Sequence, residues 1–351
     1  MNKVTALKRT PRLTLSDRAH NPVKLIIQIP CFNEEQRLPH TLSQLPRQIP
    51  GIDVVEWLIV DDGSSDRTVQ VARACGVDHI VEFPFHAGLA RAFMAGLERA
   101  VELGADIIVN TDADNQYDAA AIPSLIRPIL EGRAQFVLGE RPISEIASFS
   151  RTKRLLQRIG SQVVRMVSET SIMDAPSGFR ALSREAALRL NVFDSYTYTL
   201  ETLIEAGLTG IPVASVPVAV NDDPRPSRLV KSNLDYVARS AAAILRSFLI
   251  YKPGRAFFLI GLVPLTISLF LMVRWTAYSL LGFGGTHVPS LIAATILMTL
   301  AALTWLGGLL GELFAINRRL LEEVQYSLRR ERAERAMSLH GLGADDEVAQ
   351  G

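Results

Sequence analysis

Three aspartates lie within nine positions of the sequence, in the stretch NTDADNQYD at residues 110–118. Two of them, Asp112 and Asp114, closely follow the apolar run ADIIV at 105–109. Carboxylates this close repel one another and raise each other's pKa unless a positive charge lies between them. Two carboxylates one residue apart can bind a divalent cation that prefers oxygen ligands, and Gln116 can add a neutral oxygen. For an isolated D-x-D pattern a solvated acidic loop is the alternative, so the rest of the chain must decide.

Two further polar clusters have the same position relative to apolar runs. They are PCFNEE (30–35) and DDGSSD (61–66), and each follows a short apolar segment. The carboxyl ends of parallel strands meet along one edge of a sheet, and ligands bind at that edge. Three polar clusters at three strand ends therefore favour a binding site over unrelated solvated loops. Asp66 is an exception, because an aspartate in its position more often caps a helix N-terminus.

The elements that would position these clusters alternate between short apolar runs and amphipathic stretches. Expected strands are KLIIQIP (24–30), VVEWLIV (54–60), HIVEF (79–83), DIIVN (106–110), QFVLG (135–139) and VASVPVAV (213–220), and the clearest expected helices are 88–103 and 119–131. This alternation predicts an α/β fold with a mostly parallel sheet covered on both faces. The segment DAPSGFRALSR (174–184) reads as a loop followed by the start of a helix, and 151–168 as a basic helix.

Two uncharged apolar runs, 257–273 and 288–311, have the length of membrane spans. As helices they would extend about 26 Å and about 36 Å, against a hydrocarbon core of roughly 30 Å. Basic residues precede the first run and follow the second, whereas the loop between them is nearly uncharged. The positive-inside rule therefore predicts an integral membrane hairpin with the preceding domain and both termini in the cytoplasm. Two buried helices of a soluble bundle are the alternative.

Composition and missing motifs argue against other classes of protein. The chain of 351 residues has 37 basic and 36 acidic residues, and its net charge of +1 argues against a nucleic-acid-binding surface. Its two cysteines give neither a disulfide framework nor a metal-binding spacing. It contains neither G-x-x-x-x-G-K-[ST] nor a strand-linked G-x-G-x-x-G, which argues against P-loop enzymes and dehydrogenases. Bound phosphate would therefore be neutralised by a metal ion and arginines.

The ordered set of motifs resembles a known enzyme family. PCFNEE, DDGSSDRT, GLARAFMAG and TDADNQY, in this order, are similar to those of family 2 glycosyltransferases with the GT-A fold. DAPSGFRA, YTYTLETLIEAG and PRPSRL, followed by a membrane hairpin, resemble the polyisoprenyl-phosphate glycosyltransferase branch, which includes dolichol-phosphate mannose synthase. The resemblance covers about residues 24–316. It implies inverting transfer of a hexose from a UDP- or GDP-linked sugar to a dolichyl or undecaprenyl phosphate, with Mg²⁺ or Mn²⁺ as cofactor.

The resemblance also implies roles for individual residues. The nucleotide-sugar site would contain Pro30, Asn33, Glu34, Asp61, Asp62, Gly88, Asp112, Ala113, Asp114, Gln116 and Arg141. The metal ligands would be Asp112, Asp114 and Gln116, and the acceptor phosphate would meet Arg154, Arg225 and Arg228. Catalysis would involve Asp114, Asp174, Glu201 and Arg228. His86 departs from the asparagine often found before the G-x-x-x-A stretch, which leaves the sugar open.

Resemblance and hydropathy together predict five segments. These are a flexible leader (1–22), a GT-A domain (23–230), amphipathic interfacial helices (231–254), two transmembrane helices within 255–316 (about 256–279 and 288–312) and a charged cytoplasmic tail (317–351) with a disordered end. The expected partners are a nucleotide sugar, a polyprenyl phosphate and the bilayer, without nucleic acid; a homo-oligomer is compatible with these. Two alternatives stay open, namely transfer to a hydroxyl acceptor in glycan or glycolipid synthesis, which requires a general base, and a non-catalytic membrane scaffold.

Overall fold

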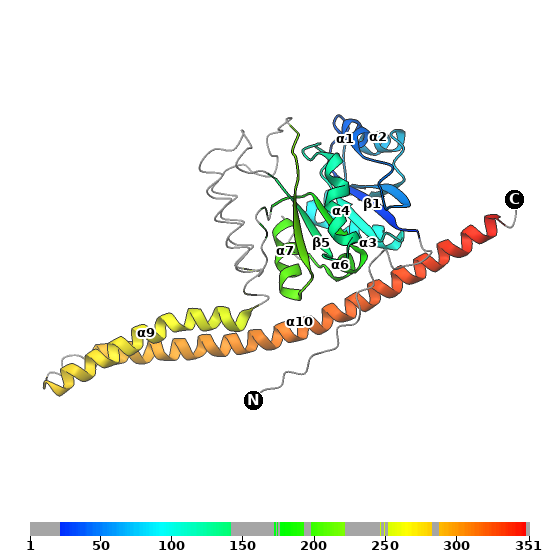
Figure 1. Cartoon of the computed structure of the whole chain (residues 1–351). Coiled ribbons are helices and arrows are strands. Elements are labelled where there is room, and N and C mark those ends of the chain that lie inside the picture. The colour runs from blue at the N-terminus through cyan, green and yellow to red at the C-terminus, as the bar shows by residue number, and fades with distance from the viewer. Residues whose placement is uncertain are drawn as a thin grey trace. The chain divides into compact units, whose positions relative to one another are not determined.

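The structure is a computed structural model that describes residues 22–141, 172, 174, 176–192, 198–221, 246, 249, 252–282 and 288–348, with side chains described as far as Ser338 (Figure 1). The described residues belong to two compact units. One unit is drawn from Met1–Ile244 and Tyr326–Gly351, and the other from Leu245–Gln325. The first contains a central β-sheet, and the second is helical.

The first unit is built around a seven-stranded sheet in the order β3-β2-β1-β4-β6-β5-β7. The strands are β1 (Lys24–Cys31), β2 (Val54–Asp61), β3 (His79–Glu82), β4 (Ile107–Asn110), β5 (Phe136–Glu140), β6 (Arg180–Ser183) and β7 (Val213–Pro217). Neighbouring strands are parallel except that β6 is antiparallel to both β4 and β5. The predicted fold class, a mostly parallel α/β sheet, is confirmed, and each of the six predicted strands is present.

Strand β6 is the element that the sequence did not reveal. The sequence predicts that RALS belongs to a loop leading into a helix, whereas helix α6 (Arg184–Arg189) begins only after the strand. The strand is four residues long, which is too short for a period to be visible. Ala181 lies opposite Val109 of β4 on one side and Val137 of β5 on the other. Pairing with two strands from elsewhere in the chain therefore imposes the extended conformation.

Helices cover both faces of the sheet (Figure 1). They are α1 (Leu38–Gln44), α2 (Thr68–Ala74), α3 (Leu89–Glu102), the 3₁₀ turn η2 (Ala119–Ala121), α4 (Ile122–Leu130), α6 and α7 (Tyr198–Thr209). On one face, Leu25, Ile27 and Ile29 of β1 lie in one buried cluster with Leu38 of α1 and Ile122 of α4. Helix α3 packs against β1 and β2 on the other face. Because both faces are covered, these strands are continuous apolar runs, which is why the sequence revealed them.

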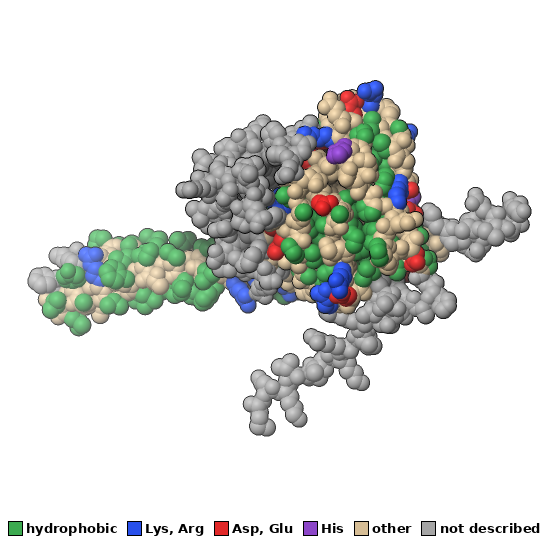
Figure 2. Space-filling view, turned by 45° about the horizontal axis from the view of Figure 1, so that its top comes forward, with side chains coloured by type: hydrophobic (Ala, Val, Ile, Leu, Met, Phe, Trp, Pro, Cys, Tyr) green, Lys and Arg blue, Asp and Glu red, His purple; other side chains and the backbone are tan. Residues whose placement is uncertain are grey.

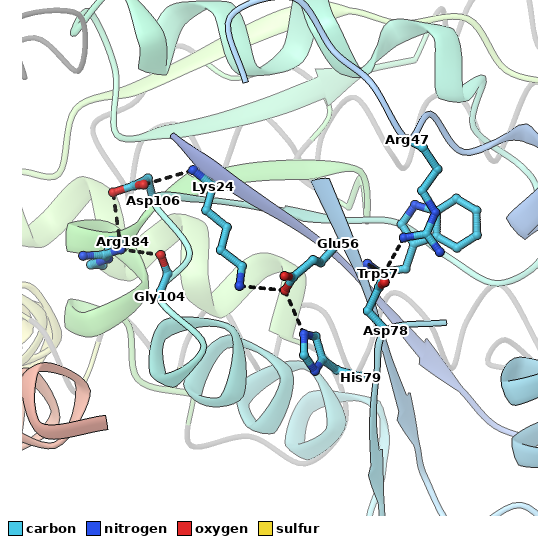
Figure 3. Close-up of polar contacts among 9 residues, drawn as sticks. All are labelled: Lys24, Arg47, Glu56, Trp57, Asp78, His79, Gly104, Asp106 and Arg184. Atoms are coloured by element: carbon cyan, nitrogen blue, oxygen red, sulfur yellow. Dashed lines mark hydrogen bonds and ion pairs between the residues drawn. The ribbon is translucent and has the colours of Figure 1, made fainter. Parts of the chain in front are cut away.

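The amino ends of the first strands are joined by ion pairs (Figure 3). Glu56 of β2 contacts both Lys24, which begins β1, and His79, which begins β3, at 2.8 Å and 2.7 Å. Asp106, just before β4, accepts the Lys24 backbone N–H at 3.1 Å and lies 3.3 Å from the Arg184 guanidinium. These contacts fix the edge of the sheet opposite to the one where the three polar clusters emerge.

The second unit contains α9 (Pro253–Leu280) and the first part of α10 (Val288–Val348). Both helices are long and apolar enough to cross a membrane, and they contain the predicted spans 256–279 and 288–312. Large hydrophobic side chains are exposed along both, which gives this unit the largely apolar surface visible in Figure 2. Exposed apolar surface of this extent fits contact with lipid rather than water.

Close contacts hold these two helices together within their unit. Ser268 Oγ donates to the Ala294 carbonyl at 2.7 Å, and the Trp305 indole N–H donates to the Phe258 carbonyl at 3.3 Å. A Cβ at Gly308 would lie 2.8 Å from the Cβ of Phe257, so the small residue permits close approach of the backbones. Small residues and interhelical hydrogen bonds are the usual means of packing helices in lipid.

The end of the tail differs from the predicted disorder, because α10 continues as a helix to Val348. Residues 328–338, which precede this end, are rich in alanine, arginine and glutamate, which are good helix formers. Arg330 pairs with Glu334, and Arg335 pairs with Glu331, both at i,i+4 spacing. The prediction of disorder rested on charge and glycine content and did not consider that the helix before this end is stabilised by helix-forming residues and ion pairs.

Candidate functional site

The carboxyl ends of β1 and β2 are followed by two loops that hydrogen-bond to each other. The Asn33 backbone N–H donates to Ser64 Oγ at 2.9 Å, and Asn33 Oδ1 accepts the Ser65 N–H at 2.8 Å. The Glu34 N–H donates to Thr68 Oγ1 at 2.9 Å. Asn33 has a φ of 55°, a conformation that asparagine tolerates better than most residues. The first two predicted polar clusters therefore form one continuous surface.

Asp61 ends β2 directly after Val60, which lies opposite Pro30 of β1. Its side chain is buried, and Oδ2 accepts the Ser64 N–H at 3.0 Å. The other oxygen, Oδ1, is buried without a hydrogen-bond donor among the described residues. An unsatisfied buried acceptor costs roughly 1–3 kcal/mol, so this oxygen is suited to accept an N–H or O–H from a ligand.

Asp62 fixes the start of helix α3. Its carboxylate accepts the backbone N–H groups of Ala87 at 2.7 Å and Gly88 at 3.0 Å. His86 Nδ1 lies 2.9 Å from Asp62 Oδ2, and the imidazole stacks on Phe32 with ring centroids 4.1 Å apart. Gly88 has a φ of 99°, which favours glycine. Asp62 therefore has a positioning role at this edge, and it leaves a stacked aromatic pair partly exposed.

The D-x-D loop is held by contacts with α1 and with the segment after β7. Thr41 Oγ1 of α1 donates to the Ala113 carbonyl at 2.8 Å. Asp114 Oδ1 accepts the Gln116 N–H at 3.1 Å, and the Gln116 carbonyl accepts the Asn221 N–H at 2.9 Å. The backbone that carries the acidic side chains is thus fixed from two directions.

The carboxylate of Asp112 is the electrostatic centre of this loop. Burial and the neighbouring Asp114 carboxylate raise the pKa of Asp112 to about 7, while the Arg141 and Arg180 guanidiniums act in the opposite direction. No hydrogen-bond donor from the described part of the chain contacts this carboxylate. Two neighbouring carboxylates, one of them without a hydrogen-bond donor, supply the oxygen ligands that a hard divalent cation requires. Gln116 follows two residues after Asp114 and carries a neutral amide oxygen. No group of three or more His, Cys, Asp or Glu side chains suited to a metal occurs within the described ranges.

Arg141 and Asp174, which were predicted for different tasks, are ion-pair partners. Arg141 Nε lies 2.7 Å from Asp174 Oδ2, and Nη2 lies 3.0 Å from Oδ1. Both side chains are buried, at 9% and 1% exposure. Their charges therefore largely compensate each other.

Arg180 is fully buried at the beginning of β6 and contacts helix α7. Its Nε donates to the Ser177 carbonyl and its Nη2 to the Thr199 carbonyl, both at 2.8 Å. Burial lowers the pKa of Arg180. Glu201, the predicted catalytic carboxylate, is also buried on α7. These contacts identify Arg180 as a group that joins the sheet to α7.

The structure brings one set of predicted residues together and leaves another undescribed. The predicted donor-site residues lie in the last residues of β1 and β2, in the loops that follow β1, β2 and β4, and at the start of α3; they are Pro30, Asn33, Glu34, Asp61, Asp62, Gly88, Asp112, Ala113, Asp114 and Gln116. The predicted acceptor-phosphate residues Arg154, Arg225 and Arg228 lie outside the described residues. Their role stays a prediction.

Sequence reasoning missed the buried polar side chains behind the D-x-D loop. Gln28 and Asn110 are fully buried in β1 and β4, where they lie opposite each other in register. Tyr117 and Tyr198 are buried nearby and hydrogen-bond the same region. The available signal was a polar residue within an otherwise apolar strand, because buried polar groups require partners.

Comparison with known proteins agrees with this geometry. Residues 26–190 match the family described as Glycosyl transferase family 2. This part of the chain is a glycosyl transferase family 2 domain. The resemblance seen in the motifs is therefore confirmed for the region that contains the D-x-D loop and the two strand-end loops before it.

Three curated relatives match just over half of this chain and most of their own length. The undecaprenyl-phosphate mannosyltransferase of Micrococcus luteus is 26% identical, over 56% of this chain and 83% of the relative. The polyprenol monophosphomannose synthase of Mycolicibacterium smegmatis is 25% identical, over 57% and 78%. The UDP-N-acetylglucosamine–dolichyl-phosphate N-acetylglucosaminyltransferase of Methanococcus voltae is 28% identical, over 54% and 82%.

Solved structures share the fold of the first unit. Glucosyl-3-phosphoglycerate synthase from Mycobacterium tuberculosis in complex with UDP is 22% identical, with a TM-score of 0.50 over 65% of this chain and 79% of that chain. The same enzyme with Mn²⁺, UDP-glucose and phosphoglyceric acid is 20% identical, with a TM-score of 0.50 over the same shares. These likenesses support the GT-A-like mixed α/β sheet.

Proposed function

We propose that this protein transfers a hexose, with inversion, from a nucleotide sugar to a polyprenyl phosphate at the cytoplasmic face of a membrane. The observation that carries the proposal is the convergence of the Asp61 and Asp62 loops with the D-x-D loop at one edge of the sheet. The names of the three curated relatives support a lipid-phosphate acceptor. The two apolar helices would keep the enzyme beside such a lipid.

The nucleoside of the donor would bind at the loops after β1 and β2. The buried Asp61 Oδ1 has no donor among the described residues, so a base N–H or a ribose O–H would satisfy it. Asp62 orders the turn before α3 and orients His86 against Phe32. Exposed aromatic faces beside this carboxylate suit the binding of a flat heterocycle.

The donor diphosphate would lie against the D-x-D loop. Asp112 and Asp114, with Gln116, would hold Mg²⁺ or Mn²⁺, because the two carboxylates repel each other in the absence of a cation. The bound cation would stabilise the charge that develops on the departing nucleoside diphosphate. Thr41 and Asn221 keep the backbone of the loop in place during this step.

A phosphate acceptor explains why a strong general base is not required. A lipid phosphate is already an anion near neutral pH, so the protein must only align it and compensate its charge. Arg141 is less suited to this task, because Asp174 already compensates its charge. Arg154, Arg225 and Arg228 are the proposed phosphate-binding side chains.

The proposed membrane face rests on the distribution of basic residues. Lys252 and Arg255 lie at the start of α9, and Arg318 and Arg319 lie in α10 beyond its apolar part. Basic residues at these ends favour the cytoplasm, where nucleotide sugars are available. A cysteine introduced at Thr286 should react with an impermeant thiol reagent in intact cells, whereas one at Ser327 should not. The opposite labelling pattern would place the catalytic domain outside.

A direct assay can test the proposed reaction. Membranes containing the protein would be incubated with labelled UDP-glucose, UDP-N-acetylglucosamine or GDP-mannose, with and without polyprenyl phosphate. We expect a labelled glycolipid from one donor, dependent on the added lipid phosphate and abolished by Asp114→Asn or by chelation. A labelled glycan without a glycolipid would identify a hydroxyl acceptor, and the absence of transfer from every donor would contradict the proposal.

A further inference from the structure

Gly178 lies directly against the carboxylate of Asp112. A Cβ added at Gly178 would lie 2.8 Å from Asp112 Oδ2 and 3.0 Å from Oδ1. Carbon and oxygen atoms cannot approach this closely without displacement, so a side chain at this position would push the carboxylate away. The Asp112 carboxylate therefore packs directly against the Gly178 backbone.

Two buried side chains hold the backbone of Gly178 from both sides. Its N–H donates to the Tyr117 hydroxyl at 2.9 Å, and its carbonyl accepts the Asn110 Nδ2–H at 2.8 Å. Asn110 is fully buried, and Tyr117 is 4% exposed. The N–H and the carbonyl of Gly178 are thus both hydrogen-bonded by side chains that flank the D-x-D loop in sequence.

The two side chains are themselves fixed by neighbours from other elements. Asn110 Oδ1 accepts Gln28 Nε2–H at 2.9 Å, and Asn110 Nδ2 also lies 3.0 Å from the Tyr198 hydroxyl. The Tyr117 ring stacks on Phe179 with centroids 5.1 Å apart. Because β1, β4 and α7 all contribute, together with Phe179 just before β6, Gly178 has little freedom to move relative to Asp112.

We propose that Asn110 and Tyr117 are positioning residues for the metal site. They clamp the Gly178 backbone against Asp112 and so hold its carboxylate in the orientation that binds the divalent cation. This inference rests on the proposed function, because it concerns the cation assigned to the D-x-D loop. Groups that orient a metal ligand without touching the metal commonly affect metal affinity about 10- to 100-fold.

A purely structural role would give a different result. If Tyr117 only stabilised the fold, Tyr117→Phe would lower thermal stability and leave the affinity for Mn²⁺ unchanged. This substitution retains the ring that stacks on Phe179 and removes only the acceptor of the Gly178 N–H. Gly178→Ala acts from the opposite side, because its methyl group would displace the Asp112 carboxylate directly.

The test is a Mn²⁺ titration of the full-length protein in detergent, with UDP and then GDP present. Free Mn²⁺ would be read from its electron paramagnetic resonance signal, and folding from circular dichroism and thermal unfolding. The matched control is Tyr326→Phe. It removes a tyrosine hydroxyl that lies 3.0 Å from the carboxylate of Glu185 on α6, away from the D-x-D loop. We expect Tyr117→Phe and Gly178→Ala to weaken Mn²⁺ binding by on the order of tenfold or more, with Tyr326→Phe unchanged.

Each outcome has a distinct meaning. Folded Tyr117→Phe and Gly178→Ala proteins that bind Mn²⁺ as the wild type does would overturn the positioning role while leaving the proposed function intact. A wild-type protein that binds no Mn²⁺ with either nucleotide would contradict the metal assignment, and the inference would fail with it. If one variant does not fold, the other still tests the clamp, because they disturb the same contact from opposite sides.

Discussion

Arg141 and Asp174 form a buried two-point ion pair, with Nε 2.7 Å from Oδ2 and Nη2 3.0 Å from Oδ1. The Arg141 backbone N–H also donates to Oδ2 at 3.2 Å. The sequence assigned Arg141 to the donor diphosphate and Asp174 to catalysis. Their pairing gives both residues a structural task, because removal of one would leave the other as an uncompensated buried charge.

The first prediction follows from this pair. Arg141→Met should lower the free energy of unfolding by about 3–5 kcal/mol, because it leaves the Asp174 carboxylate buried without its partner. The double variant Arg141→Met with Asp174→Asn should recover a large part of the loss. Denaturation of the detergent-solubilised proteins would measure both effects. If Arg141→Met retained wild-type stability and lost only nucleotide binding, Arg141 would be a direct diphosphate ligand.

The second prediction concerns the dependence of stability on pH without metal. The pKa of Asp112 in the folded protein is about 7, whereas an unfolded aspartate has a pKa of about 3.9. Between these values the folded state binds more protons, so its stability should fall as the pH rises towards about 7. Melting temperatures in EDTA should therefore decrease over this range, and Mn²⁺ should reduce the decrease.

Asp112→Asn provides the control for that measurement. The variant lacks the titrating carboxylate, so in EDTA its melting temperature should change less over the same pH range. An equal slope for wild type and variant would show that other groups dominate the titration.

The third prediction concerns the last helix. Arg329 Nη1 donates to the Leu190 carbonyl at 2.9 Å, and Nη2 lies 3.2 Å from Glu98 on α3. Arg329→Ala should lower the free energy of unfolding of the first unit by about 1–2 kcal/mol. Most of this loss should come from the charged hydrogen bond to Leu190, because the pair with Glu98 is partly solvated. Thermal unfolding would measure the change.

The neighbouring Arg330 provides the control. It pairs with Glu334 on the same helix, so Arg330→Ala should have little effect on stability. Equal effects would contradict a specific stabilising role for the Arg329 contacts, because alanine is the stronger helix former and neither substitution lowers helix propensity.

The parts of the fold that the sequence predicted are those with a local signal. KLIIQIP and DIIVN are recognisable because strands buried on both faces are continuous apolar runs. The rule that ligands bind at the carboxyl ends of such strands was enough to predict that Asp61, Asp62 and the D-x-D loop lie along one edge of the sheet. These inferences needed no knowledge of contacts between distant residues.

The parts that the sequence did not predict depend on distant contacts. Asn110 and Gly178 are 68 positions apart, and Tyr117 and Gly178 are 61 apart, so no spacing rule connects them. The pairing of Arg141 with Asp174, 33 positions apart, was missed for the same reason. Strand β6 was missed because its conformation depends on β4 and β5 rather than on its own four residues.

The last prediction concerns the acceptor and Arg228. An arginine can offer paired donors to phosphate oxygens, which lysine replaces only as a point charge. Arg228→Ala should lower transfer to polyprenyl phosphate by on the order of a hundredfold, from about 3 kcal/mol of lost transition-state stabilisation, and Arg228→Lys should recover part of it. Hydrolysis of the nucleotide sugar by water is the control, because it involves no acceptor phosphate. Equal loss of transfer and hydrolysis would assign Arg228 to the donor diphosphate, and no loss of either would remove it from the site.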